Sequence, residues 1–180
     1  MSIVSYPIPQ QLQVPIEPYT TGDYHHFGKQ LPFKKVLHII HLGDDVQALP
    51  DTPSQAIGDG EVVFSEIKAG KADHKTWGGL VVIGHTDKKT NQVFYSVYGH
   101  MYKLAVAVGT GVTKGQVIGY VAPALTPENG WWQHPHLHFS IYTGPWHGQI
   151  LPGYKRPTEF WRTRLEWWKD PQTFISRYTT

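Results

Sequence analysis

The sequence predicts an all-β fold in a single domain. At 180 residues, the chain is long enough to bury one hydrophobic core and too short for two ordinary domains. From residue 36 onward, short apolar runs alternate with turn signals, which is the rhythm of an all-β protein. A convincing helix occurs only at the C-terminal end. We therefore expect a twisted antiparallel sheet with a smaller sheet or hairpins over it and a cleft between the two.

Residues 1–35 are predicted to form an extended, proline-rich arm, and residues 36–180 to form the domain itself. The prolines of the arm interrupt any helix, and no hydrophobic periodicity survives between them. These prolines are Pro7, Pro9, Pro15, Pro18 and Pro32.

The strands are expected where the apolar runs lie. These runs cover residues 36–40, 57–64, 80–83, 93–98, 116–121 and 136–142. Asp59-Gly60 is typical of a hairpin turn, and the glycines between residues 109 and 119 punctuate two further short strands. The C-terminal helix begins at Asp170, a suitable N-cap followed by proline, and packs back through Phe174 and Ile175.

Composition excludes several classes of function. Lys and Arg total 16 against 14 Asp and Glu, a net charge of +2 with no charged run, so nucleic acid is not the expected partner. The start of the chain lacks the features of a secretory signal, and no window approaches a membrane span, so we expect no membrane insertion. With no cysteine and 11 histidines, any metal must be held by His and carboxylate.

The strongest local feature is a His-x-His pattern at residues 136–138. On a strand, His136, His138 and Ser140 share one face because side chains alternate. Two imidazoles therefore face one cleft. For an isolated His-x-His, a solvated strand face with incidental histidines explains the pattern equally well.

Two weaker patterns precede it in the chain. His41 ends an apolar run and is followed four residues later by Asp45, while Gly43 lets the backbone turn so that both side chains can reach one ion. His100 closes another strand-like run after Tyr98. Each pattern alone matches many proteins by chance.

Taken in order, these residues resemble the M23 (lysostaphin/LytM-like) metallopeptidase family. The similarity covers roughly residues 36–176. The matching segments are His41-Leu42-Gly43-Asp44-Asp45, residues 57–63, residues 79–85, Tyr98-Gly99-His100-Met101, residues 108–119, His136-Leu137-His138 and residues 170–175. Gly99 stands where the family has Ala. Residues 123–132 depart from the family, many members of which have a shorter loop there, and this loop bears on substrate choice.

The resemblance implies that His41, Asp45 and His138 bind one Zn²⁺ per chain, while His100 and His136 are catalytic histidines outside the coordination shell. It implies a zinc metalloendopeptidase that hydrolyses stem peptides or cross-bridges of bacterial peptidoglycan, on a fold like a barrel-sandwich hybrid. The substrate implies action outside the cytoplasm, and we expect a monomer. Two imidazoles and one carboxylate leave a coordination position for water, as hydrolytic zinc requires.

Two other functions remain open from the sequence. A non-catalytic cell-wall-binding or hydrolase-activator module on the same fold would have lost some of the five residues, and all five are present. A non-haem iron oxygenase also uses two His and one carboxylate, but has no use for His100 and His136.

Further residues are expected to have minor roles. We interpret the remaining histidines as surface, loop or packing residues: His25, His26, His38, His74, His85, His134 and His147. A separate hypothesis places the arm near the cleft mouth, with His25 or His26 able to approach the open metal position. The aromatic residues of the C-terminal third are expected mostly to pack, with some lining a groove for glycan or stem peptide. They are Trp131, Trp132, Trp146, Trp161, Trp167, Trp168, Tyr142 and Tyr154.

Overall fold

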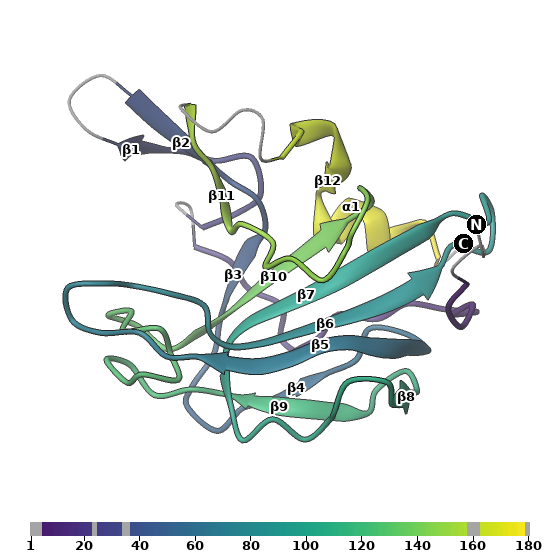
Figure 1. Ribbon diagram of the computed structural model, residues 1–180, viewed down its shortest axis with the longest axis horizontal. Coiled ribbons are helices and arrows are strands. Elements are labelled where there is room, and N and C mark those ends of the chain that lie inside the picture. The colour runs from purple at the N-terminus through teal and green to yellow at the C-terminus, as the bar shows by residue number, and fades with distance from the viewer. Residues whose placement is uncertain (1–4, 23–24, 34–36, 158–162, 179–180) are drawn as a thin grey trace.

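The computed structural model describes residues 5–22, 25–33, 37–157 and 163–178. Within these ranges the prediction of an all-β fold with one short C-terminal helix is confirmed (Figure 1). The elements are β1 (Gln30–Phe33), β2 (Leu37–His41), β3 (Asp44–Gln47), β4 (Pro53–Gln55), β5 (Gly60–Lys68), β6 (Gly78–Thr86), β7 (Val93–Tyr102), β8 (Gly111–Val112), β9 (Val117–Val121), β10 (His136–Tyr142), β11 (Tyr154–Lys155), the 3₁₀ helix η2 (Leu165–Trp167), β12 (Trp168–Lys169) and α1 (Pro171–Ser176).

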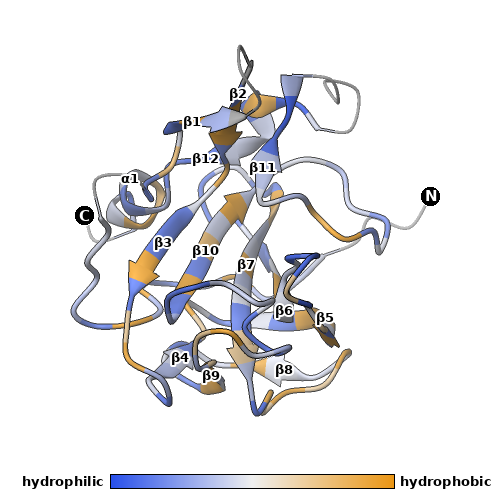
Figure 2. Ribbon diagram, turned by 90° about the vertical axis from the view of Figure 1, so that its left-hand side faces the viewer, coloured by the Kyte–Doolittle hydropathy of each residue, from blue (hydrophilic) through white to orange (hydrophobic). Residues whose placement is uncertain are grey.

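The strands form two antiparallel sheets. The larger sheet has the order β12-β10-β7-β6-β5-β8, with β3 added beside β10 and the pair β4 and β9 joined through β7. The smaller sheet has the order β1-β2-β11. It lies over the part of the large sheet that contains β3 and β10 (Figures 1 and 2). The predicted arrangement of a large twisted sheet with a smaller one over it is therefore confirmed.

The central strands β6 and β7 are buried on both faces. Alternate residues of β6 enter two different hydrophobic clusters, with Val81 and Ile83 in one and Leu80 and Val82 in the other. Because side chains on a strand alternate between faces, a nearly continuous apolar run is what a strand covered on both sides requires. The two clusters therefore cover both faces in the middle of the large sheet.

The N-terminal residues pack along this body. Leu12 and Ile16 are buried in the larger hydrophobic cluster. The backbone N–H of Gln13 donates to the carbonyl of Ile57, and that of Gln55 donates to Pro15. The division of the chain at residue 35 stays a prediction.

The turn at Asp59-Gly60 differs from the expected hairpin. Gly60 begins β5, but the preceding strand β4 pairs with β9, and β5 pairs with β6 and β8. Between them Ile57 is fully buried, and its N–H donates to the Tyr98 hydroxyl at 3.1 Å. Because Ile57 is buried between them, β4 and β5 do not pair with each other as the two strands of a hairpin would.

The C-terminal helix follows its sequence signals. The Asp170 side chain accepts a hydrogen bond from the N–H of Thr173 at 2.7 Å, and Pro171 occupies the first turn. Phe174 and Ile175 are buried in the larger cluster. Among the described residues, none of the helices has the length and apolar character needed to cross a membrane.

Candidate metal centre

Three strands bring His41, Asp45 and His138 together. His41 is the last residue of β2, Asp45 lies in β3 and His138 lies in β10. Asp45 and His138 are direct partners in the antiparallel register of β3 and β10. Directly opposite residues on one face of an antiparallel pair have their Cβ atoms within about 5.5 Å. All three side chains are buried, and together they form a group that could hold a metal ion.

The donor atoms of these residues converge on one point. Nε2 of His41 lies 3.1 Å from Nδ1 of His138, and Oδ1 of Asp45 lies 2.9 Å from that Nδ1 and 3.3 Å from that Nε2. A tetrahedral zinc ion with ligands at about 2.0–2.1 Å has ligand–ligand edges of roughly 3.3 Å. The three separations therefore fit one face of a zinc tetrahedron.

The opposite ring nitrogens of both histidines have their own acceptors. Nδ1 of His41 donates to the carbonyl of His26 at 3.3 Å, and Nε2 of His138 donates to Oγ of Ser140 at 2.8 Å. Each acceptor fixes the tautomer that leaves the lone pair of the other nitrogen pointing at the convergence point. Both imidazoles are therefore oriented as metal ligands.

Gly43 allows the loop between β2 and β3 to approach β10 this closely. A Cβ at Gly43 would lie 2.3 Å from Oγ of Ser140 and 2.8 Å from Nε2 of His138. The sequence predicts a turn here. The structure adds that a side chain would displace the group that orients His138.

The protonation states suit cation binding. Burial acts to raise the pKa of the Asp45 carboxyl, but the adjacent side chains of His138, His25 and His41 lower it well below its usual range. Burial lowers the pKa of His138 to about 4, against the opposing effect of Asp45. The centre therefore presents one carboxylate and a neutral His138 at neutral pH, which is the charge pattern that a divalent cation requires.

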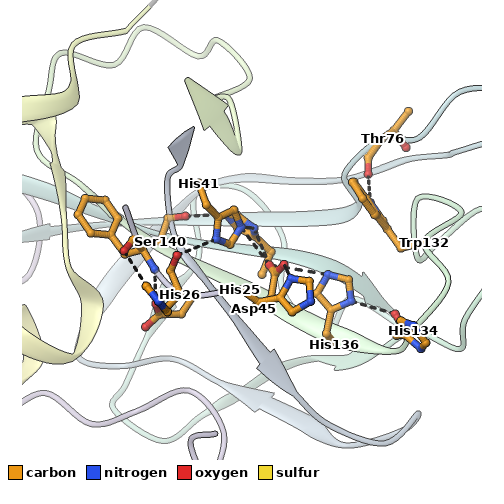
Figure 3. A network of polar contacts seen from close by, with 12 residues as sticks. His25, His26, His41, Asp45, Thr76, Trp132, His134, His136 and Ser140 are labelled. Atoms are coloured by element: carbon orange, nitrogen blue, oxygen red, sulfur yellow. Dashed lines mark hydrogen bonds and ion pairs between the residues drawn. The ribbon is translucent and has the colours of Figure 1, made fainter. Parts of the chain in front are cut away.

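His136 and His100 lie beside this group. Their ring centroids are 4.6 Å apart, and Nε2 of His136 is 3.8 Å from Oδ1 of Asp45. Figure 3 shows His25, His41 and His136 around the Asp45 side chain. All five residues predicted for the site are thus brought into one cluster. The role assigned to each stays a prediction.

The two histidines differ in their surroundings. Nδ1 of His136 donates to the carbonyl of His134 at 2.9 Å, which leaves Nε2 with its lone pair directed toward the centre. His100 is buried with a left-handed backbone (φ 65°), and its Nδ1 has no hydrogen-bond partner within the described part of the chain. Burial, and then the charges of His136 and His138, lower the pKa of His100 well below its usual value, so this imidazole is neutral.

A cavity of about 480 Å³ opens beside the cluster. His100 and His138 form part of its wall, so a bound molecule would lie against the candidate centre. The other residues that line it are Leu31, Ile39, Lys75, Thr76, Trp77, Trp132, Pro152, Gly153, Tyr154 and Arg156. The wall is therefore largely apolar and aromatic, as is usual for ligand sites.

Two further aromatic residues lie around the centre: Tyr154, which belongs to the C-terminal aromatic residues of which some are expected to line a groove, and Trp77, which was missed from the sequence. Tyr154 lies in β11, where it pairs with His41, and the two ring centroids are 5.0 Å apart. Burial raises the pKa of the Tyr154 phenol, which stays protonated. Trp77 lies 5.9 Å from His100 in a stacked arrangement. Neither residue stands in a motif that suggests a site, and their positions depend on long-range strand pairing.

His25 and His26 also lie beside the centre, where the separate hypothesis about the arm expects one of them, although both contact candidate ligands and not the open metal position. Nδ1 of His25 lies 3.2 Å from Oδ2 of Asp45, and His26 acts through its backbone carbonyl. His85, by contrast, is a packing residue as expected. It is fully buried and bonded to the Asp59 carbonyl and to Ser96.

Comparisons with known proteins agree with the resemblance found in the sequence. The model of a protein family described as peptidase family M23 matches residues 39–150, which is more than half of the chain. A curated relative, glycyl-glycine endopeptidase ALE-1 of Staphylococcus capitis, is 33% identical over 103 residues. That match covers 57% of this chain and 25% of the relative, so the chain spans about a quarter of the relative's length.

Solved structures share the fold. The catalytic domain of the antimicrobial peptidase lysostaphin from Staphylococcus simulans aligns with a TM-score of 0.56 at 23% identity, over 88% of this chain and 92% of that one. A zinc-containing peptidase from Vibrio cholerae aligns with a TM-score of 0.58 at 23% identity, over 74% of this chain and 37% of that one.

Proposed function

The chain belongs to peptidase family M23, and from this premise we propose that it is a zinc-dependent endopeptidase that hydrolyses peptide bonds in bacterial peptidoglycan. The observation that carries the proposal is the set of three buried donor atoms, on His41, Asp45 and His138, separated by 2.9–3.3 Å. This set matches the ligand spacing of tetrahedral zinc and leaves one position for water.

Zinc bound by these residues would lower the pKa of a water molecule toward neutrality and polarise the carbonyl of the scissile bond. His136 is suited to accept a proton from an attacking water molecule, because Nδ1 donates to His134 and Nε2 keeps its lone pair on the side of Asp45. The same imidazole can then deliver the proton to the leaving amine.

His100 is suited to a different role. Buried N–H groups without an acceptor are rare in proteins, whereas buried acceptors without a donor are tolerated more often. The partnerless Nδ1 therefore favours the tautomer with its proton on Nε2. As a neutral donor in the wall of the cavity, His100 can hydrogen-bond the oxyanion that develops on the scissile carbonyl.

The proposed function extends to the metal stoichiometry, the oligomeric state and the location of the protein. We propose one zinc ion per chain, because His41, Asp45 and His138 form one candidate group, and we propose a monomer. Action on peptidoglycan places the protein outside the cytoplasm. A non-catalytic cell-wall module or an iron oxygenase is a weaker proposal, because each leaves His100 and His136 without a role.

The test combines metal analysis with a hydrolysis assay. The purified protein should hold about one zinc per chain, release soluble fragments from purified peptidoglycan and lose this activity to a chelator. Mass spectrometry of the released ends identifies the bond. Zinc binding without hydrolysis would favour the non-catalytic module, and stoichiometric iron with 2-oxoglutarate turnover would favour the oxygenase.

A further inference from the structure

The cavity beside the centre has aromatic walls that are fixed before any ligand binds. Nε1 of Trp77 donates to the carbonyl of Leu151 at 2.9 Å. Nε1 of Trp132 donates to the carbonyl of Thr76 at 3.0 Å (Figure 3). Tyr154 closes the wall, with its ring centroid 6.4 Å from that of Trp132. Because the hydrogen bonds hold both indoles, little conformational entropy is lost when a ligand enters.

The size and polarity of this cavity favour a substrate residue with a side chain. The space of about 480 Å³ is bounded by these rings and by Leu31 and Ile39. A glycine residue has no side chain with which to fill it, so a polyglycine segment would leave apolar wall exposed to water. A residue with a larger side chain would gain roughly 25 cal/mol of binding free energy for each Å² of apolar surface that it removes from water.

The charged residues that line the cavity indicate which substrate side chain it would bind. Lys75 and Arg156 line it, and none of its described lining residues is acidic. Nζ of Lys75 lies 4.7 Å from the centroid of the Trp132 ring, which places the cation against the aromatic wall. A carboxylate is therefore the complementary group.

We propose that this cavity is a subsite for a carboxylate-bearing residue of a peptidoglycan stem peptide, adjacent to the cleaved bond, and that the enzyme prefers such peptides to glycine bridges. The proposal rests on the proposed peptidase function. Trp77, Trp132 and Tyr154 would contact the aliphatic part of the residue, and Lys75 its carboxylate.

The experiment compares three synthetic substrates with the zinc-loaded protein: a cross-linked stem peptide with a free carboxylate beside the scissile bond, the same peptide with that carboxylate amidated, and pentaglycine. We expect the highest kcat/KM for the first. Equal or faster cleavage of pentaglycine would overturn the subsite while leaving the peptidase function intact. Absence of hydrolysis of all three and of whole peptidoglycan would instead overturn the peptidase function.

Two substitutions test which residues of the cavity wall contact the substrate. Lys75→Met should raise KM for the free-carboxylate peptide roughly two- to fivefold, the range of an exposed ion pair, and leave the amidated peptide unchanged. Lys71→Met is the matched control, since Lys71 lies in the same connection between β5 and β6 but does not line the cavity. Trp132→Ala should raise KM for both stem peptides roughly tenfold. An equal effect of Lys75→Met on both peptides would contradict the charge assignment.

A second, independent observation concerns the segment that precedes the family match. Residues 19–22 and 25–29, here called the N-terminal strap, run beside the ligand residues. The N–H of Asp45 donates to the carbonyl of His25 at 2.7 Å, the N–H of His41 donates to Lys29 at 3.0 Å, and the N–H of Gly28 donates back to His41 at 2.9 Å. Two of the three candidate ligands thus have their backbones bonded to the strap.

Side chains add to this attachment. The carboxylate of Asp44 accepts from the Tyr19 hydroxyl at 2.7 Å and from the N–H of Phe27 at 2.8 Å, which holds the strap at two points. Nδ1 of His25 lies 3.2 Å from Oδ2 of Asp45, the oxygen that does not face the two ligand nitrogens. His25 is therefore placed to orient this carboxylate without occupying the convergence point.

We infer that His25 is a positioning residue for the metal centre, which acts by holding the Asp45 carboxylate, and that the strap supports metal binding instead of obstructing it. This inference also rests on the proposed zinc site. Groups that bond to metal ligands in this way commonly change metal affinity by 10–100-fold when removed.

Zinc affinity of the full chain, measured by competition with a chromogenic chelator, tests the inference without an activity assay. His25→Leu should weaken zinc binding roughly tenfold. His25→Asn should restore most of it, because the Asn amide can donate from the position of Nδ1. His26→Ala is the matched control, since His26 contacts His41 through its backbone and should leave affinity unchanged.

Other results would overturn the positioning role. Unchanged affinity in His25→Leu, or an equal loss in His25→Asn and His25→Leu, would show that this hydrogen bond does not orient the ligand. Tighter zinc binding or faster peptide hydrolysis in His25→Leu would show that the strap obstructs the centre. Circular dichroism of the metal-free variants checks that each is folded.

Discussion

Trp77 packs directly on Gly99, so closely that a Cβ at Gly99 would lie 2.4 Å from Cε3 of the indole. Gly99 precedes His100 in β7, and Trp77 stacks on His100. The absence of a side chain at Gly99 therefore gives the indole its place in the cavity wall. This contact explains why position 99 is a glycine, where the M23 family has alanine.

We expect Gly99→Ala to destabilise the protein by about 1–3 kcal/mol, the usual cost of overpacking a rigid site. Urea denaturation measures the change in the free energy of unfolding. In a Trp77→Ala background the same substitution should cost less than about 1 kcal/mol, because the clashing ring is gone. Equal costs in the two backgrounds would show that the two residues are not coupled.

The neighbouring histidines of β10 should separate metal binding from catalysis. His138→Ala removes one of the three candidate ligands and should lose both zinc and hydrolysis. His136→Ala should keep zinc near wild-type occupancy, while its rate falls by roughly 10²- to 10⁴-fold, the usual loss for a positioned acid–base group or oxyanion donor. His100→Ala should behave like His136→Ala.

Zinc content and peptidoglycan hydrolysis are measured on the same preparations, with circular dichroism to exclude unfolding. If His136→Ala sheds zinc while His138→Ala retains it, the two roles are reversed.

Ser140 should influence zinc affinity although it is not a ligand. Its Oγ lies 2.8 Å from Nε2 of His138, and Ser140→Ala would leave that buried N–H without its acceptor. We expect zinc affinity to fall by about 10–100-fold. Competition with a chelator measures it. A similar loss of stability in the metal-free and zinc-loaded forms, with unchanged affinity, would indicate a packing role only.

His85 should make stability depend on pH in the acid range. Burial lowers the pKa of His85 to about 4 from its usual value near 6.5. The unfolded chain therefore takes up a proton at higher pH than the folded one. The contribution of His85 is fully present above pH 6.5 and is lost as the pH falls from 6.5 to about 4, a total of roughly 3 kcal/mol.

His85→Gln keeps a polar group at this position but cannot titrate. The free energy of unfolding of this variant should depend less on pH between 6.5 and 4 than that of the wild type, with both proteins measured free of metal. The other buried histidines titrate in both proteins, so their contributions cancel in the difference. Parallel pH curves would contradict the assignment.

Features that arise from neighbouring residues could be predicted from the sequence. The alternation of faces along residues 136–140 places His136, His138 and Ser140 together, and the structure keeps them on one side of β10. Asp170 and Pro171 signalled the start of the C-terminal helix, where α1 begins. The resemblance to a family supplied the grouping of His41, Asp45 and His138, which residue spacing alone left open.

The contacts between distant segments could not be predicted from local patterns and depend on the tertiary fold. His138 and Asp45 are 93 residues apart in sequence, and the antiparallel register of β3 and β10 places them opposite each other. The contacts of His25 with Asp45 and of Trp77 with Gly99 also join segments that are separated in the sequence. The physical reason is that local periodicity specifies which face of a strand a side chain occupies, whereas strand pairing depends on burial and hydrogen bonding summed over the whole chain.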